Sequence, residues 1–264
     1  MGSIRLENHT IGFEQSGEGP PLILLHGIGS NRNSWSHQFK DLADDFTLVA
    51  WDAPGYGLSS DPVAETPTMA EYADCLKEFL DELDIGPMHL LGHSMGGIIA
   101  QEFYRRYPET VKTLILADTT RGGGAEPEQV RVRKLEERLS LIQRLSPRQL
   151  AEKRTPGLFS KCAREGVVRD AIAIMAAIRP SGYRYAAIAM SGADERDLLG
   201  KINVRTLLIW AAEDHVIPSA EAEEMRRAIP NVRFEVIPQA GHLCYQERPG
   251  TFNALIRQFC LADS

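Results

Sequence analysis

The chain has 264 residues, of which 43% are hydrophobic and 25% are charged, and its formal net charge at pH 7 is -7. This length and composition allow one large α/β domain with a substantial core, while the acidic balance argues against a nucleic-acid partner, which needs a clustered basic surface. Because residues 1–10 include Arg5, Glu7 and Asn8, we expect no signal-type leader. The longest apolar run, 171–178, is too short to span a bilayer, so we expect a cytoplasmic protein without a membrane partner.

Short apolar segments alternate with helical patterns along most of the chain. The later segments are continuous apolar runs, which is typical of parallel strands that helices cover on both faces. The pattern therefore predicts an α/β fold with a mostly parallel, eight-stranded sheet flanked by helices. We expect strands at 4–7, 11–15, 22–25, 47–51, 88–91, 112–117, 206–210 and 233–237, and helices at 36–44, 69–83, 95–107, 220–228 and 249–260.

Strand signals disappear between residues 120 and 199, where helical spacing takes over. Ser146, Pro147 and Gln149 form the pattern of a capped helix start. The sequence thus predicts a core at 1–119 and 200–264 and an inserted helical cap at 120–199. A cap that folds over the strand ends excludes water from a pocket and selects substrate shape.

The pentapeptide Gly92-His93-Ser94-Met95-Gly96 lies between the expected strand 88–91 and the helix that follows. Glycines on both sides of the serine suit a turn in which a side chain would collide with its neighbours. A serine at the apex of a strand–turn–helix unit is exposed to attack a substrate. We therefore interpret Ser94 as a nucleophile.

Two further residues complete the set that serine chemistry requires. Asp214 and His242 follow the expected strands 206–210 and 233–237, and loops at strand ends are where sites of open α/β sheets form. The imidazole of His242 would take the serine proton, and Asp214 would orient the imidazole. The backbone N–H groups of Ile28 and Met95 are the expected oxyanion donors.

In their order along the chain, five motifs resemble landmarks of the α/β-hydrolase superfamily: His26-Gly27, the segment 52–57, the segment 92–97, Asp214 and Gly241-His242. Within it the chain looks most similar to bacterial 3-oxoadipate enol-lactonases and small esterases, with the meta-cleavage-product carbon–carbon hydrolases as close cousins. Those cousins carry a tryptophan after the catalytic histidine, where this chain has Leu243. The resemblance thus favours the ester or lactone side.

The resemblance and the residues lead to three functional hypotheses. The first is hydrolysis of a small carboxylic ester or lactone through a Ser94 acyl-enzyme. The second is hydrolytic cleavage of a carbon–carbon bond in a vinylogous diketone, and the third is a non-catalytic ligand receptor. All three imply a small-molecule partner and no metal or organic cofactor, and they leave the oligomeric state open.

Several residues near the motifs have alternative interpretations. Asp118 follows the expected strand 112–117 and is the second candidate for the acid, whereas Asp52 is expected to hold a turn. His93 and His215 are expected to be structural or exposed. The four cysteines show no C-x-x-C pair or metal-ligand spacing, so free thiols are expected.

Apolar and cationic side chains of the cap region are candidates for the pocket wall, although simple core positions would explain the apolar ones equally well. An arginine inside the cap would favour an anionic substrate, and Arg179 and Arg184 are considered for this role beside Arg121, against a solvated cap surface. The run 131–138 mixes both signs of charge and is expected to form an exposed helix face. The candidate substrate-binding residues are Trp35, Arg121, Met175, Tyr183 and Met190.

Overall fold

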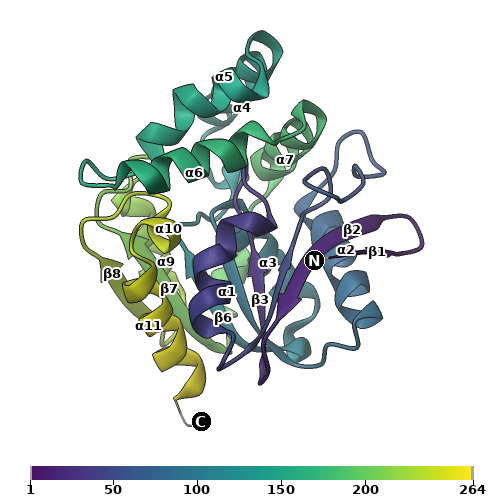
Figure 1. Cartoon of the computed structure of the whole chain (residues 1–264), viewed down its shortest axis with the longest axis vertical. Helices are drawn as coiled ribbons and strands as arrows, with labels where there is room; N and C mark the ends of the chain where they lie inside the picture. Colours follow the sequence, from purple (N-terminus) through teal and green to yellow (C-terminus); the bar gives the residue numbers. More distant parts are fainter. Residues whose placement is uncertain (1, 263–264) are drawn as a thin grey trace.

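The computed structural model describes residues 2–262 and contains one mixed sheet with helices on both faces (Figure 1). The sheet has eight strands in the order β1-β2-β4-β3-β5-β6-β7-β8, and only the pairs β1–β2 and β2–β4 are antiparallel. The predicted α/β fold is therefore confirmed. The strands are β1 (Gly2–Arg5), β2 (Thr10–Ser16), β3 (Pro21–Leu25), β4 (Thr47–Trp51), β5 (Met88–His93), β6 (Val111–Ala117), β7 (Arg205–Ala211) and β8 (Arg233–Ile237).

Two hydrophobic layers enclose the parallel strands. In β3, Leu22 and Leu24 pack with one layer, whereas Ile23 and Leu25 pack with the other. Both faces are buried, which explains the continuous apolar runs in the sequence. Helices α1 (Ser36–Leu42) and α11 (Pro249–Leu261) cover the first face; α2 (Met69–Glu82), α3 (Met95–Arg106) and α9 (Ser219–Ala228) cover the second.

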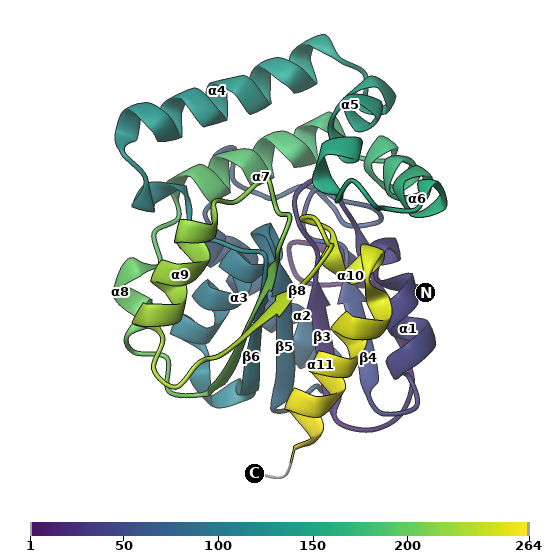
Figure 2. The same cartoon turned by 90° about the vertical axis from the view of Figure 1, so that its left-hand side faces the viewer.

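Four helices between β6 and β7 lie together at one end of the sheet (Figure 2), and we call them the inserted helices. They are α4 (Glu128–Arg144), α5 (Pro147–Arg154), α6 (Glu165–Ala176) and α7 (Pro180–Gly192). The predicted start of α5 is confirmed, because Ser146 and Gln149 form a reciprocal capping box. Short 3₁₀ turns occur at η1 (Arg32–Trp35), η2 (Pro108–Thr110), η3 (Gly123–Ala125) and η4 (Thr155–Leu158), and two short helices are α8 (Arg196–Leu199) and α10 (Cys244–Glu247).

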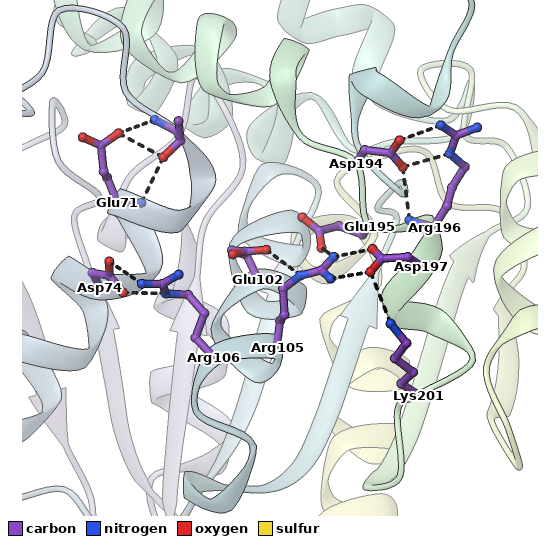
Figure 3. Close-up of polar contacts among 11 residues, drawn as sticks. Glu71, Asp74, Glu102, Arg105, Arg106, Asp194, Glu195, Arg196, Asp197 and Lys201 are labelled. Atoms are coloured by element: carbon purple, nitrogen blue, oxygen red, sulfur yellow. Dashed lines mark hydrogen bonds and ion pairs between the residues drawn. The ribbon is translucent and has the colours of Figure 1, made fainter.

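Both ends of the inserted segment are joined to each other and to the core. The Glu195 N–H donates to the Arg121 carbonyl at 2.8 Å, which pairs the outgoing chain with the returning chain. On α3, Arg105 binds the Glu195 carboxylate at 2.7 Å and Asp197 at 3.0 Å (Figure 3). Burial raises the pKa of Glu195 to about 7, and the hydrogen bond from Arg105 opposes that shift. The inserted helices are therefore anchored where they leave the sheet.

Membrane-spanning helices and metal-binding clusters are both absent from residues 2–262. None of their helices is both long enough and apolar enough to cross a membrane. Nor do these residues contain a group of three or more His, Cys, Asp or Glu side chains suited to a metal ion. All four cysteines are free thiols, as the spacing predicts.

Candidate active site

Ser94 occupies a strained turn between β5 and α3. Its φ of 53° and ψ of -117° lie outside the regions that L-residues ordinarily adopt. A Cβ atom on Gly92 would lie 2.2 Å from the carbonyl oxygen of Gly96, and one on Gly96 would lie 2.1 Å from that of Leu25. Only glycine fits at either position, so the two glycines permit the turn that presents the serine.

A chain of hydrogen bonds links three residues from three loops. The distance from Ser94 Oγ to His242 Nε2 is 3.1 Å, and His242 Nδ1 lies 2.8 Å from Asp214 Oδ2. All three side chains are almost completely shielded from solvent. The loops follow β5, β7 and β8, whose carboxyl ends lie at the same edge of the sheet. The structure thus brings together the residues that the sequence identified.

The carboxylate of Asp214 is held by the loop that follows β7. Its second oxygen, Oδ1, accepts hydrogen bonds from the N–H groups of Val216 at 2.7 Å and Ile217 at 3.2 Å. Charge-assisted bonds of this kind fix the carboxylate orientation. These bonds therefore fix the orientation in which the Asp214 carboxylate contacts the imidazole of His242.

Asp118, the second candidate acid, has a different partner. Its Oδ1 atom accepts the Ala211 N–H at 2.8 Å and so braces the end of β7. The side chain is fully buried, and burial raises the pKa of Asp118 to about 7. This carboxyl group supports the strand that carries Asp214, whereas Asp214 itself contacts the imidazole.

His93 contacts the backbone of the histidine loop. Its Nε2–H donates to the carbonyl of His242 at 2.7 Å, and its ring centroid lies 4.9 Å from that of His242. Burial, followed by the proximity of His242, holds the pKa of His93 well below its ordinary value, so the ring is neutral. The expected structural role of His93 agrees with these contacts, and His215 is exposed as expected.

The loop after β3 is supported by Asp52. This buried carboxylate accepts the Arg32 N–H at 3.0 Å and the Leu58 N–H at 2.9 Å, and it forms an ion pair with the Arg32 guanidinium. The prediction that Asp52 holds a turn is confirmed. Within the same loop Gly29 has a φ of 79°, and Ile28 lines a cavity beside Ser94.

Met95 is the first residue of α3, directly after Ser94. The first N–H groups of a helix lack partners within the helix and carry the positive end of its dipole. The oxyanion role of Met95 and Ile28 stays a prediction.

Ser94 lines two cavities beneath the inserted helices. We call them the large cavity, of about 230 Å³, and the small cavity, of about 50 Å³. Arg138 and Val216 also line both cavities, so these two residues lie with Ser94 where the two spaces approach each other. The Ser94 side chain therefore borders both cavities.

The predicted substrate-binding residues divide between these cavities, with one exception. Met175 and Tyr183 line the small cavity, and Arg121 and Met190 line the large one. Trp35 lines neither; it is fully buried and packs on the Tyr245 ring at 4.3 Å. The assignment of Trp35 to the pocket is therefore corrected, because η1 directs its indole into the core behind the loop.

Of the three arginines considered for an anion site, one, Arg121, lines either of these cavities, and the solvated cap surface is the other alternative. Arg121 is bound by Glu221 at 2.8 Å and by Glu224, Arg179 bonds the Asp61 carboxylate at 2.8 Å, and Arg184 is exposed. The run 131–138 has the expected exposed face, formed by residues 132, 133, 136 and 137, but Arg138 at its end is partly buried and lines both cavities. Helix α4 brings this residue to the cavity wall beside Ser94, which the charge pattern alone does not reveal.

Glu247 is a buried residue that the sequence patterns did not single out. Its Oε2 atom accepts the Gly241 N–H at 2.9 Å and the Ser160 N–H at 3.1 Å. It thereby joins the histidine loop to the segment between α5 and α6. No local motif marks this role, because the partners are distant in sequence.

With this geometry established, comparison with known proteins assigns the family. The model of the alpha/beta hydrolase fold family matches residues 20–249. The chain belongs to that family, as the ordered motifs predicted.

Related proteins carry several activities in their names. The chain is 29% identical over 251 residues to the dihydrolipoyllysine-residue acetyltransferase component of the acetoin cleaving system of Cupriavidus necator, covering 93% of this chain and 65% of that relative's length. It is also 25% identical over 276 residues to 2-hydroxy-6-oxo-6-phenylhexa-2,4-dienoate hydrolase of Burkholderia cepacia, covering 96% of this chain and 92% of the relative. The relatives therefore include a carbon–carbon hydrolase, as expected of the cousins.

Solved structures show the same architecture. A thermophilic esterase from Thermogutta terrifontis is 30% identical, with a TM-score of 0.88 and coverage of 97% of this chain and 96% of that one. The enol-lactonase from Burkholderia xenovorans LB400 is 21% identical, with a TM-score of 0.90 and coverage of 99% and 100%. At that identity the enol-lactonase is evidence for the fold alone.

Proposed function

We propose that this chain is a serine hydrolase that cleaves a small carboxylic ester or lactone through an acyl-enzyme on Ser94. The observation that carries the proposal is the hydrogen-bond chain from Ser94 through His242 to Asp214, beside two cavities. Similarity to an esterase at 30% identity supports it. The proposed activity requires no group beyond those of the protein.

In the first half of the reaction, Ser94 Oγ attacks the carbonyl carbon while His242 Nε2 takes the serine proton. Asp214 stabilises the resulting imidazolium. The oxyanion would accept hydrogen bonds from the N–H groups of Met95 and Ile28. His242 then returns the proton to the departing alkoxide, so the C–O bond breaks and Ser94 is acylated.

In the second half, water replaces the alcohol. His242 takes a proton from the water as its oxygen attacks the acyl carbon, and the collapse of this intermediate returns the proton to Ser94. The products are a carboxylic acid and an alcohol, or one hydroxy acid from a lactone. The inserted helices would limit entry of other water during acyl transfer.

Carbon–carbon hydrolysis is the second candidate, and the similarity to the dienoate hydrolase favours it. The same serine and histidine would serve both reactions. Leu243 after the histidine supports the ester side, as argued from the sequence. A substrate panel separates the two candidates.

Initial rates of the purified protein would be measured on short aryl esters, five-membered enol-lactones and a coloured meta-cleavage diketone. Each would be repeated with Ser94→Ala, which removes the nucleophile. We expect ester or lactone turnover that falls by at least about 10⁵-fold in the variant. Retention of most activity by Ser94→Ala would contradict the mechanism, and preference for the diketone would select the second candidate.

A further inference from the structure

The cations around the two cavities differ in how they are neutralised. In the large cavity, Arg121 is paired with Glu221 and Glu224, and Lys134 forms an ion pair with Glu126. Arg138 lines the same cavity, yet its guanidinium forms neither an ion pair nor a hydrogen bond with any residue in the range 2–262. Its hydrogen-bond donors are therefore free to bind a ligand.

The small cavity adds a second guanidinium. Arg154 lines it together with Arg138, and Arg154 Nη1 donates to the hydroxyl of Tyr183 at 2.8 Å. Among the residues that line this cavity, all within the described chain, none is Asp or Glu. Ser94 and His242 lie in the same wall. Two guanidinium groups thus line the small cavity together with Ser94 and His242, and no carboxylate lines that cavity.

Two neighbouring guanidinium groups in one cavity wall repel each other, and this repulsion destabilises the site unless an anion pairs with them. Burial lowers the pKa of Arg138 and the neighbouring Arg154 acts in the same direction, while Tyr183 and Glu126 oppose the shift. A partly buried guanidinium without an ion-pair partner loses part of its solvation, and a bound anion would give it a paired, hydrogen-bonded state. The whole chain carries a net charge of -7, so general attraction of anions does not explain the site. The positive charge of this site is therefore confined to the region of Arg138 and Arg154.

We infer that Arg138, assisted by Arg154, binds a carboxylate of the substrate, so that the natural ester or lactone is an anion with its negative group close to the scissile bond. A guanidinium matches a carboxylate with two parallel hydrogen bonds. Because Arg138 borders both cavities, the carboxylate can belong to the acyl half or to the alcohol half. This inference rests on the proposed function, whose substrate class it names.

Matched neutral and charged esters test the inference. The acyl arm compares 4-nitrophenyl butyrate with 4-nitrophenyl hydrogen glutarate, and the alcohol arm compares phenyl acetate with 4-acetoxybenzoate. We expect wild-type kcat/KM to favour the charged member of at least one pair. In Arg138→Gln, kcat/KM for that member should fall about 10- to 100-fold, as expected for loss of a hydrogen-bonded charge pair, while the neutral esters change by less than about twofold.

Arg133→Gln is the matched control, since Arg133 is an exposed arginine on the same helix. It should leave every ester unchanged. Equal loss on charged and neutral esters in Arg138→Gln would show that the arginine merely supports the helix, and this would overturn the inference. A wild-type preference for both neutral esters would overturn it as well.

Calorimetric titration with glutarate gives a readout that does not depend on turnover. Wild type should bind glutarate, and Arg138→Gln should bind it at least about tenfold more weakly. If no ester is hydrolysed but glutarate binding depends on Arg138, the proposed function fails and the anion site stands. If esters are hydrolysed but wild type does not bind glutarate, or Arg138→Gln binds it as tightly as wild type, the anion site fails alone.

Discussion

The loops at the strand ends and the inserted helices are built differently. At the strand ends, Ser94, His242 and Asp214 are almost fully shielded and joined by hydrogen bonds, and Asp118 and His93 brace them from behind. Within the inserted helices, α4 has no buried residue along its length. Its Arg138 nonetheless lines both cavities.

This contrast has a physical consequence. Groups that move protons must be held within a few tenths of an ångström, which a packed sheet edge achieves. Groups that recognise a substrate need to face open space, which a helix resting on the sheet provides. The predicted reaction is therefore expected to depend on the strand ends, and the choice of substrate on the inserted helices.

The largest expected effect after loss of the nucleophile comes from the acid. Asp214→Asn should reduce kcat by about 10⁴-fold, because an amide neither stabilises the imidazolium nor selects the required tautomer. Steady-state kinetics on the best ester measures it. Asp118→Asn is the control, since this carboxyl bonds the Ala211 N–H; a loss as large as that of Asp214→Asn would reverse the assignment of the acid.

A smaller effect is expected at His93. His93→Phe keeps an aromatic ring but loses the donor to the His242 carbonyl, so kcat should fall about tenfold while KM stays constant, because a barrier increase of about 1.4 kcal/mol corresponds to one factor of ten. His93→Gln retains an N–H and should restore most of the rate. Retention of the rate by His93→Phe together with its loss in His93→Gln would contradict this and indicate that only the shape of the ring matters.

A pH-dependent effect on stability is expected at Asp118. A carboxyl group whose pKa rises from 3.8 to about 7 on folding stabilises the protein most at low pH, and this contribution is lost as pH increases through about 7. Asp118→Asn cannot ionise, so its free energy of unfolding relative to wild type should increase between pH 5 and pH 8. Urea unfolding at both values measures the difference. The pKa of Glu195 is also raised to about 7, but its contribution to stability is the same in wild type and in Asp118→Asn and cancels in the difference. A pH-independent difference would refute the linkage.

The smallest expected effect is the loss of stability when a helix cap is removed, and the chain offers two equivalent caps for comparison. Thr68 at the start of α2 and Ser146 at the start of α5 both form capping boxes, each accepting an N–H at 3.3 Å. Thr68→Ala should lower the global free energy of unfolding by about 1 kcal/mol. Ser146→Ala should lower it less and instead accelerate hydrogen exchange within α5, since the inserted helices are expected to open locally. Equal global losses would show that both regions unfold together.

Much of this architecture was readable from local signals. The strand 47–51 and the α5 start at Ser146 agree with prediction, because apolar runs and capping residues act over a few positions. The proximity of Ser94, Asp214 and His242 follows from the rule that carboxyl ends of parallel strands share one edge. Trp35 was misplaced because an aromatic side chain suits a core and a pocket wall equally well.

The sequence by itself determined the sheet, the strained serine turn and the order of the reacting groups, since each depends on short-range patterns and general rules of topology. Only the tertiary structure decided which charges are paired. Arg121 and Arg138 are both arginines of the inserted segment, yet Glu221 pairs with Arg121 across 100 residues, whereas the Arg138 guanidinium forms no ion pair within residues 2–262. Charge pairing depends on distances between remote segments, and only packing of the inserted helices on the sheet sets those distances.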